Sequence, residues 1–470
     1  MRVSGGIITL HNLYEAINLE NLKVDKNKRK LRPLTVLIAG FLAVILTGTL
    51  LLMLPLSSAS GEVTDPITAG FTAVSATCVT GLTTVETGAY WSVFGQIVIL
   101  CMIQVGGLGF MTMAVLLSLI IRRNISPRER MIVAMSYNLN DYGSTVKLVR
   151  RILLGTVGFE LLGAALLAIR FIPKFGTGRG IYMSVFHSIS AFCNAGFDIL
   201  GNGNSMGDYY GDPLVCLTLM ALISIGGIGF IVWGDLVNFR TRRKLSVYSK
   251  FVLILTAVFT VLGTAYVAIS EWNNPLTIGN YSVGEKLLCS AFQSVTWRTA
   301  GFATVDQASL HGATKIFGGI MMFIGGASGS TAGGVKVATV GILVLTVMSV
   351  SVGKTEINLF KRRVPSGVIL RAMTLVSIQL LLIFVATLLC NVVSSAPLID
   401  LFYEVVSAGG TVGLTASLTP TLHPFALVVL MCMMFFGRLG ILTITLAIAT
   451  RSSERAPSVL TYPDANILIG

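Results

Sequence analysis

Long stretches with almost no charge constrain this sequence more than any other feature. Examples are residues 33–55, 94–121, 213–232 and 369–393. A helix of about 20 apolar residues crosses the ~30 Å hydrocarbon core of a bilayer. Over the whole chain, 54% of the residues are hydrophobic and only 12% are charged, which leaves too little polar surface for a soluble protein of this length. We therefore predict an all-α protein that crosses a membrane several times.

The basic residues gather in short clusters beside the apolar stretches and give the chain a net charge of +13. These clusters lie at 23–32, 122–130, 147–151, 240–250, 354–371 and 451–455. The connections 56–95 and 396–425 contain neither Lys nor Arg. Because Lys and Arg favour the cytoplasmic side of a membrane, we expect a multi-pass protein of the cell membrane with both termini in the cytoplasm. Loop orientation explains the positive charge without a nucleic-acid partner.

Candidate catalytic and metal-binding residues do not group in the sequence. The seven cysteines and four histidines are scattered along the chain, and no Cys-x-x-Cys pair occurs. No nucleophile is accompanied by a recognisable base. The glycine-rich runs at 105–110 and 225–230 lie inside apolar stretches, so they are not phosphate-binding loops. We expect a protein that is not an enzyme and binds no cofactor itself.

Four blocks repeat along the chain, and each is predicted to contain a long apolar helix, a shorter mixed segment and a second apolar helix. The first helices are predicted at 33–55, 148–171, 250–271 and 369–394. The second helices are predicted at 92–121, 213–237, 314–350 and 424–448. The mixed segments read FTAVSATCVTGLTT (71–84), FHSISAFCNAGFDI (186–199), FQSVTWRTAGFATV (292–305) and YEVVSAGGTVGLTA (403–416). Each joins an amphipathic start to a Gly that precedes Leu or Phe.

The mixed segments are too short and too polar to cross a bilayer, and irregular backbone survives at that depth only beside a cavity. Four such loops around one axis can present rings of carbonyl oxygens that replace the water around a cation. Glycine suits them because the backbone needs positive φ and close approach. The predicted filter segments are Val79, Thr80 and Gly81; Asn194, Ala195 and Gly196; Thr299, Ala300 and Gly301; and Thr411, Val412 and Gly413. The alternative is that these glycines only allow tight helix packing.

A second glycine-rich marker recurs within the second helices, at 105–110, 225–230, 324–330 and 436–441. In this register Arg438 replaces the glycines at 107, 227 and 326. A charge inside an apolar span is costly unless it faces water or a partner. We predict that Arg438 projects into the pore below the filter segments and slows cations. The alternative is a structural arginine paired with a carboxylate or with carbonyls at a helix end.

The third block departs from the others at GGASGSTAGGVKV, residues 325–337. Glycine costs about 1 kcal/mol per residue in a helix, so a continuous helix is not expected here. We predict a broken, mobile gate beneath the filter segments, with a static close-packed segment as the alternative. The candidate gate residues are Gly325, Gly326, Ser328, Gly329, Ser330, Thr331, Gly333, Gly334 and Lys336.

The predicted architecture is an all-α membrane protein with four helix–pore loop–helix repeats, or eight transmembrane helices, around one central pore. The repeats would occupy 33–121, 122–239, 240–353 and 354–450, with the second helix of the third repeat broken. Segment 1–32 and tail 451–470 would be cytoplasmic.

With four filter glycines, a broken helix in the third repeat and an arginine in the last span, the sequence resembles the potassium transporter superfamily that includes Trk, Ktr and plant relatives. It looks most like the membrane subunit of a bacterial Ktr system, since segment 1–32 leaves no room for the additional hairpin of the Trk branch. The resemblance implies potassium as the transported ion, because sodium-carrying plant relatives have Ser where this chain has Gly81. It also implies a homodimer, sodium stimulation and a cytoplasmic ring of nucleotide-binding regulators that senses ATP and ADP.

An alternating-access carrier of another cation or a small solute is the competing hypothesis. A proton-coupled carrier should have an acidic residue in mid-span, and Glu160 is the clearest candidate. Its position in a predicted first helix, outside the filter segments, suggests instead a buried structural group that pairs with a neighbouring helix.

Overall fold

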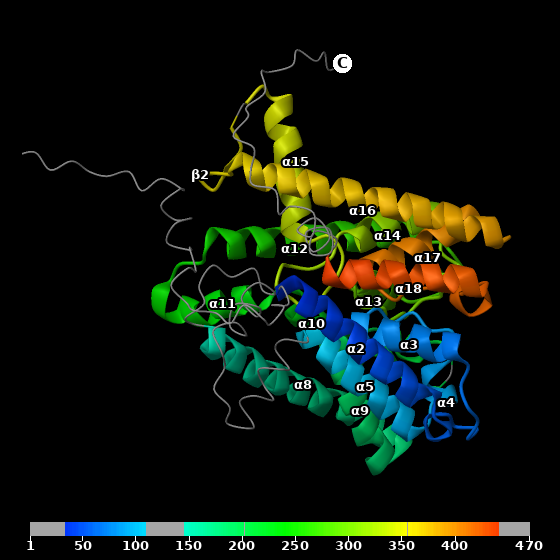
Figure 1. The fold of residues 1–470 in the computed structure, drawn as a ribbon. Helices are drawn as coiled ribbons and strands as arrows, with labels where there is room; N and C mark the ends of the chain where they lie inside the picture. Colours follow the sequence, from blue (N-terminus) through cyan, green and yellow to red (C-terminus); the bar gives the residue numbers. More distant parts are fainter. Residues whose placement is uncertain (1–32, 110–144, 202, 355, 441–470) are drawn as a thin grey trace, which may run out of the picture.

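The computed structural model describes residues 33–109, 145–201, 203–354 and 356–440 (Figure 1). Four of its helices are long and apolar enough to cross a membrane, or five if the bent pair α10 and α11 counts as one span. The four are α2 (Pro33–Met53), α8 (Thr145–Phe175), α12 (Val247–Glu271) and α16 (Ser366–Val393). They coincide with the predicted first helices. The expectations for segment 1–32, for 110–144 and for the last 30 residues lie outside the described residues.

Four shorter helices occupy the mixed segments, and two of them end directly before a predicted filter segment, whereas the other two end one or two residues earlier. They are α3 (Pro66–Cys78), α9 (Thr177–Phe192), α13 (Val283–Thr296) and α17 (Leu398–Gly410). Capping fixes where two of them begin: the Asp65 carboxylate accepts from the N–H groups of Ile67 and Thr68, and Ser282 forms a capping box with Glu285.

Within the described residues, each of the second apolar helices ends or breaks at its glycine-rich marker, and the break in the third block is the one that the sequence predicted. They are α5 (Val93–Leu108), α10 (Pro213–Gly227) with α11 (Phe230–Arg242), α14 (Gly312–Phe323) with α15 (Val337–Ser351), and α18 (Pro424–Leu439). The prediction of one continuous helix over 213–237 is wrong, since α10 and α11 meet at 99°. The left-handed φ of +91° at Gly229 explains the break, and Gly109 and Gly440 have similar φ values where α5 and α18 end.

The helices pack in a closed cycle around the short ones. Within each block the first helix contacts its own short helix. Between blocks, α5 packs against α9, α10 against α13, α14 against α17, and α18 against α3 (Figure 1). Each second helix therefore contacts the short helix of the following block, and the last block returns to the first.

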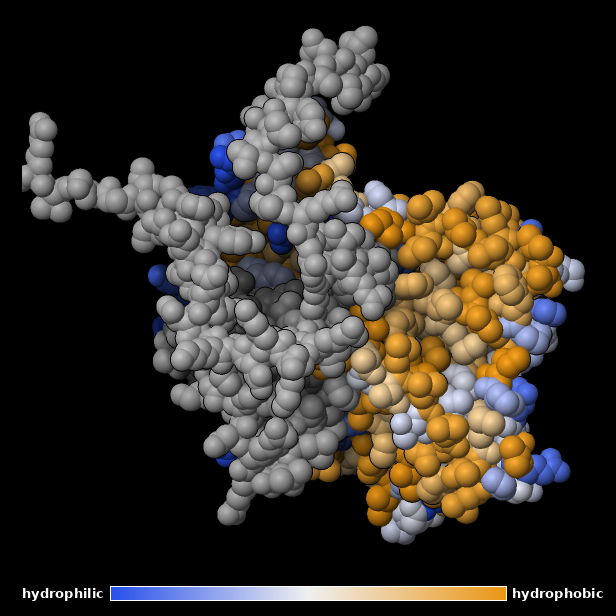
Figure 2. Space-filling model, in the orientation of Figure 1, coloured by the Kyte–Doolittle hydropathy of each residue, from blue (hydrophilic) through white to orange (hydrophobic). Residues whose placement is uncertain are grey.

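The outer faces of the long helices are apolar. Leu46 and Leu50 of α2, and Leu381 and Phe384 of α16, are more than 50% exposed. Figure 2 shows a broad hydrophobic area over the end of the molecule that holds α2, α16 and α18, with hydrophilic residues along its rim. Exposed apolar helix faces of this extent suit a lipid environment.

The remaining elements are small connections between these helices. They are α4 (Thr87–Tyr90), the 3-10 turns η2 (Pro55–Ser57), η3 (Gly207–Tyr209) and η4 (Thr419–Thr421), and the hairpin of β1 (Asn358–Leu359) with β2 (Arg362–Arg363).

Candidate ion pathway

The four filter segments share one unusual backbone conformation. In each, the first residue and the glycine two positions later both have positive φ. The pairs are Val79 (+57°) and Gly81 (+98°), Asn194 (+60°) and Gly196 (+68°), Thr299 (+70°) and Gly301 (+81°), and Thr411 (+52°) and Gly413 (+94°). Sequence reasoning anticipated positive φ at the glycines but missed the first residues, because Val and Thr rarely adopt it and Asn194 was the one residue among them whose type favours it. Four strained residues in register indicate a conformation imposed by the surrounding fold.

The four glycines lie side by side in a ring. A Cβ atom placed on each would press against the carbonyl oxygen that precedes the next glycine in chain order. These oxygens belong to Ala195 (2.5 Å from Gly81), Ala300 (2.7 Å from Gly196), Val412 (2.5 Å from Gly301) and Thr80, which meets Gly413. The last contact returns to the first block, so the ring closes. The fold thus brings all four filter segments together around one axis.

A hydroxyl residue at the end of each short helix holds the filter segment that follows it. The backbone carbonyl of this residue accepts a hydrogen bond from the residue before the glycine, at 2.8 Å for Ser75, Ser190 and Ser407 and 3.0 Å for Thr296. The side-chain oxygens of Ser75 and Ser407 also accept from the N–H groups of Gly81 and Gly413, both at 3.1 Å. Sequence reasoning missed these residues, although a Ser or Thr at this place in all four blocks is a visible signal.

The Ser190 and Thr296 hydroxyls bond differently, because they donate to the carbonyls of Phe197 and Phe302, at 2.7 and 2.6 Å. The third block also reaches its glycine with one residue fewer: Ala300 bonds four residues back, whereas Thr80, Ala195 and Val412 bond five residues back. The ring is therefore pseudo-symmetric, because the filter segments of the four blocks are held by different hydrogen bonds.

Loop 325–337 lies against the inner ends of the filter segments. Thr331 donates through Oγ1 to the Phe192 carbonyl at 3.1 Å, at the end of α9. A Cβ atom on Gly333 would collide with the Thr411 side chain, and one on Gly334 would lie 3.2 Å from the Gly410 carbonyl oxygen. The loop therefore touches the second and fourth blocks where their short helices meet the filter segments.

The rest of loop 325–337 is anchored to the end of α10, to the start of α11 and to itself. The Gly227 carbonyl accepts from Ala327 N–H at 2.9 Å, and the Gly329 carbonyl accepts from Phe230 N–H at 2.9 Å. Within the loop, Ser330 Oγ donates to the Ala327 carbonyl and Lys336 Nζ to the Ala332 carbonyl, at 2.7 and 2.8 Å. Where the loop begins and ends, the Gly325 N–H donates to the Val335 carbonyl, and the Gly326 carbonyl accepts from the Val337 N–H. The Ser328 carbonyl accepts from the Tyr248 hydroxyl of α12. All the predicted gate residues thus lie in one segment between α14 and α15.

Arg438 joins the last block to loop 325–337 and to the first block. Its guanidinium donates to the Thr331 carbonyl in the loop and to the Gly106 and Gly107 carbonyls at the end of α5, with a distance of 3.0 Å to Gly107. Neither alternative from the sequence covers this arrangement fully. The arginine does bind helix-end carbonyls, and it also holds the loop that lies beneath the ring.

Glu160 lies on α8, outside the filter segments. The residue is 8% exposed, and its carboxylate accepts from Gln104 Nε2 of α5 at 3.0 and 3.3 Å. This contact matches the structural pairing with a neighbouring helix that the sequence suggested. Within the described ranges, no three His, Cys, Asp or Glu side chains come together as they would to hold a metal ion.

Comparisons with known proteins agree with this geometry. The family model described as TrkH, cation transport protein, matches residues 19–456. The chain is 39% identical over 447 residues to the potassium/sodium uptake protein NtpJ of Enterococcus hirae, which covers 94% of this chain and 98% of that protein. It is 38% identical over 441 residues to the Ktr system potassium uptake protein B of Bacillus subtilis, covering 93% and 97% respectively.

The potassium transporter TrkH from Vibrio parahaemolyticus, a solved crystal structure, has the same fold. The TM-score is 0.69 over 90% of this chain and 86% of that chain, at 19% sequence identity. The family match confirms that the chain is a transport protein and not an enzyme. With its apolar long helices and its closed ring of four filter segments, this chain belongs to the TrkH family of cation transport proteins.

Proposed function

We propose that this chain takes up potassium ions across the cell membrane through the ring of its four filter segments, 79–81, 194–196, 299–301 and 411–413. The observation that carries the proposal is the cyclic contact of each filter glycine with a carbonyl of the next block. Carbonyl rings of this kind replace the hydration shell of a cation. The names of the two similar uptake proteins, which mention potassium, support the choice of ion.

Two features of the ring favour a cation. The helices α3, α9, α13 and α17 all end at the filter segments, and the C-terminal end of a helix carries partial negative charge. In addition, the Thr80 and Thr411 hydroxyl oxygens are buried without a hydrogen-bond partner among the described residues. Leaving such an oxygen unpaired is costly, and a cation or its water would satisfy it. These residues fit a monovalent cation.

In this proposal loop 325–337 is the gate and Arg438 its latch. The loop lies directly below the ring, and the arginine binds it to α5. A cation leaving the ring toward the cytoplasm would meet both the loop and a positive charge. Opening then requires the loop to leave Phe192 and Arg438 and to break its backbone hydrogen bonds to α10 and α11. It also uncovers Ala327, which is buried in an apolar cluster with Val232 and Phe251.

The assembly around the pore is also part of the proposal. We expect four repeats, 33–121, 122–239, 240–353 and 354–450, and a homodimer with one pore in each subunit. A cytoplasmic ring of nucleotide-binding regulators would open the gate in response to ATP and ADP, and sodium would stimulate uptake. The Bacillus subtilis relative is named as protein B of a Ktr system, which supports a second component beside this chain.

Uptake of rubidium into liposomes tests the function directly. The purified chain, with and without a Ktr-type regulator and ATP, should take up rubidium that potassium displaces far better than sodium does. No uptake under any of these conditions, or equal displacement by both ions, would contradict a potassium filter.

A variant of Glu160 separates the pore from a proton-coupled carrier. Glu160→Gln should retain rubidium uptake within about twofold, because a glutamine at this position still pairs with Gln104 and a neutral hydrogen bond contributes only about 1 kcal/mol. Glu160→Ala is the control for lost packing. Complete loss of uptake in Glu160→Gln, with normal protein levels, would favour the carrier.

A further inference from the structure

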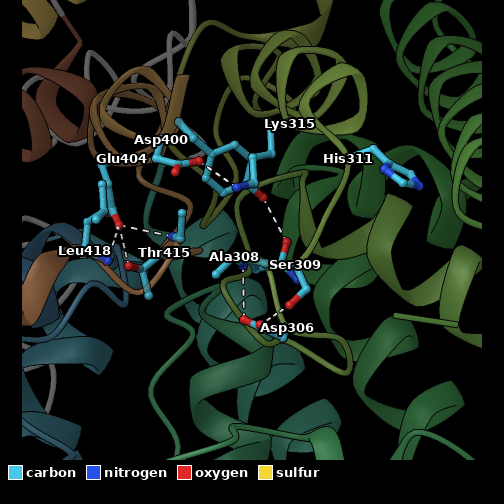
Figure 3. A network of polar contacts seen from close by, with 12 residues as sticks. Asp306, Ala308, Ser309, His311, Lys315, Asp400, Glu404, Thr415 and Leu418 are labelled. Atoms are coloured by element: carbon cyan, nitrogen blue, oxygen red, sulfur yellow. Dashed lines mark hydrogen bonds and ion pairs between the residues drawn. The ribbon is translucent and has the colours of Figure 1, made fainter. Parts of the chain in front are cut away.

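Behind the filter segment of the fourth block lies a buried carboxylate, Glu404 of α17. Its side chain is 0% exposed. Figure 3 shows it pointing at the chain that follows the filter segment, where Thr415 and Leu418 bond to it. Removing a carboxylate from water is costly unless hydrogen-bond donors surround it. The residues that donate to Glu404 are therefore fixed in position by it.

All the hydrogen bonds recorded for the Glu404 carboxylate come from residues 415–419. Oε1 accepts from the Thr415 hydroxyl and from the N–H groups of Ala416 and Leu418, the last two at 3.1 and 3.3 Å. Oε2 accepts from the Thr419 hydroxyl at 2.8 Å. Hydrogen bonds to a charged group are about twice as strong as neutral ones. The segment that directly follows Gly413 is therefore tied to α17 along its length.

The same face of α17 holds the filter segment at its other end and is itself anchored. One turn after Glu404, Ser407 accepts from the Gly413 N–H at 3.1 Å. One turn before it, Asp400 forms a 2.6 Å ion pair with Lys315 of α14 (Figure 3). Both partners are mostly buried, with side-chain exposures of 17% and 8%. Residues spaced three or four apart lie on one helix face, so Asp400, Glu404 and Ser407 share one face of α17. This face positions the segment from Gly413 to Thr419.

The corresponding positions in the other blocks carry weaker contacts. Thr72 donates to Thr68 within its own helix, at 2.9 Å. His187 Nε2 accepts from the Ile199 N–H at 3.4 Å, and Gln293 exchanges two hydrogen bonds with Gln307, at 2.6 and 3.1 Å. Among these four positions, only that of the fourth block accepts four hydrogen bonds from the segment that follows its filter glycine. The buried carboxylate is thus specific to the fourth block.

We infer that Glu404 is a positioning residue that sets the ion selectivity of the filter by holding residues 415–419 behind Gly413. The inference rests on the proposed function, because it assumes that the ring selects the ion. A ring of carbonyls discriminates between cations only while its oxygens keep their places, and residues held by networks of hydrogen bonds keep theirs best. Without the carboxylate, the fourth filter segment gains freedom and the ring accommodates sodium more easily.

The test compares Glu404→Ala with wild type in rubidium uptake, with potassium or sodium as competitor. Glu404→Ala removes the acceptor of all four hydrogen bonds, and we expect the preference for potassium to fall by about tenfold, because only part of that loss reaches the filter segment. Glu404→Gln keeps an accepting oxygen for Thr415 and should lie closer to wild type. A change in maximal uptake rate without a change in preference would contradict the inference.

Glu271→Ala is the matched control, because Glu271 is also 0% exposed and also accepts four hydrogen bonds, from Asn274, Thr277, His311 and Thr314. None of these donors belongs to a filter segment or to residues 415–419. A loss of preference in Glu404→Ala but not in Glu271→Ala supports the inference, and an equal loss in both overturns it.

A second pair of variants decides the matter if Glu404→Ala does not accumulate in the membrane. Thr415→Val and Thr419→Val each remove one donor to the carboxylate while they keep the side-chain volume. Reduced preference for potassium in either supports the inference, and a preference equal to wild type in both overturns it. If wild type itself shows no preference, the proposed function fails, and this outcome is distinct from failure of the inference.

Discussion

Gly81→Ser is expected to weaken the preference for potassium over sodium by roughly 5- to 150-fold. Gly81 has a φ of +98°, and a Cβ atom there would lie 2.5 Å from the Ala195 carbonyl oxygen, an oxygen of the ring itself. Side chains in such conformations cost about 1–3 kcal/mol, which corresponds to that range in an equilibrium constant. Because the obstacle is the backbone of Ala195 and Gly196, which cannot move aside like a flexible side chain, the ring must widen to relieve the clash. Rubidium uptake with sodium as competitor measures the change.

Gly61→Ser is the control for backbone strain alone. Gly61 also has a left-handed φ, +74°, but no atom lies within 4 Å of a Cβ placed there. This variant should keep the preference of wild type, because any strain falls outside the ring. If Gly81→Ser also kept it, the close contacts around the ring would not set selectivity, and the alternative that these glycines serve helix packing would be favoured.

Arg438→Gln is expected to raise the rate of cation uptake by about tenfold. A unit charge about 4 Å from a passing cation opposes it by about 4 kcal/mol at an effective dielectric constant of ~20, and the three carbonyls around the guanidinium offset part of this. The variant also removes the contact between α18 and the Thr331 carbonyl, which frees loop 325–337. Initial rubidium uptake without a regulator measures both effects together.

Arg438→Lys separates the charge from the hydrogen bonds. Lysine keeps the positive charge but cannot span Gly107 and Thr331 with a planar fork of donors. A barrier made by charge predicts slow uptake in Arg438→Lys, whereas a latch on the loop predicts uptake as fast as in Arg438→Gln. Loss of uptake in both variants would assign Arg438 to the stability of the pore and contradict the barrier.

The sequence predicted much of this architecture because the underlying signals are local. Charge-free runs located α2, α8, α12 and α16. The recurring Gly before Leu or Phe located the four filter segments that follow the short helices. The eight Gly, Ser and Thr residues within 325–334 predicted the interruption between α14 and α15. Each of these inferences needs only the hydropathy or the conformational preference of residues close together in the chain.

Other features depended on contacts between distant parts of the chain. The bend of 99° between α10 and α11 was missed because Ile228 and Gly229 sit in an apolar run that reads as one helix. The left-handed conformations of Val79 and Thr411 were missed because these residue types do not favour them. Glu404 was overlooked because a lone carboxylate gains meaning only from the donors that surround it.

The sequence by itself determined that this chain is a multi-pass helical membrane protein with four related blocks, because hydropathy, charge and glycine spacing are properties of the chain alone. Only the tertiary structure decided that the four glycines close into one ring and that Arg438 binds loop 325–337 beneath it. The physical reason is that these contacts join backbone carbonyls of separate blocks. Every residue has such a carbonyl, so no pattern of side chains reveals which ones meet.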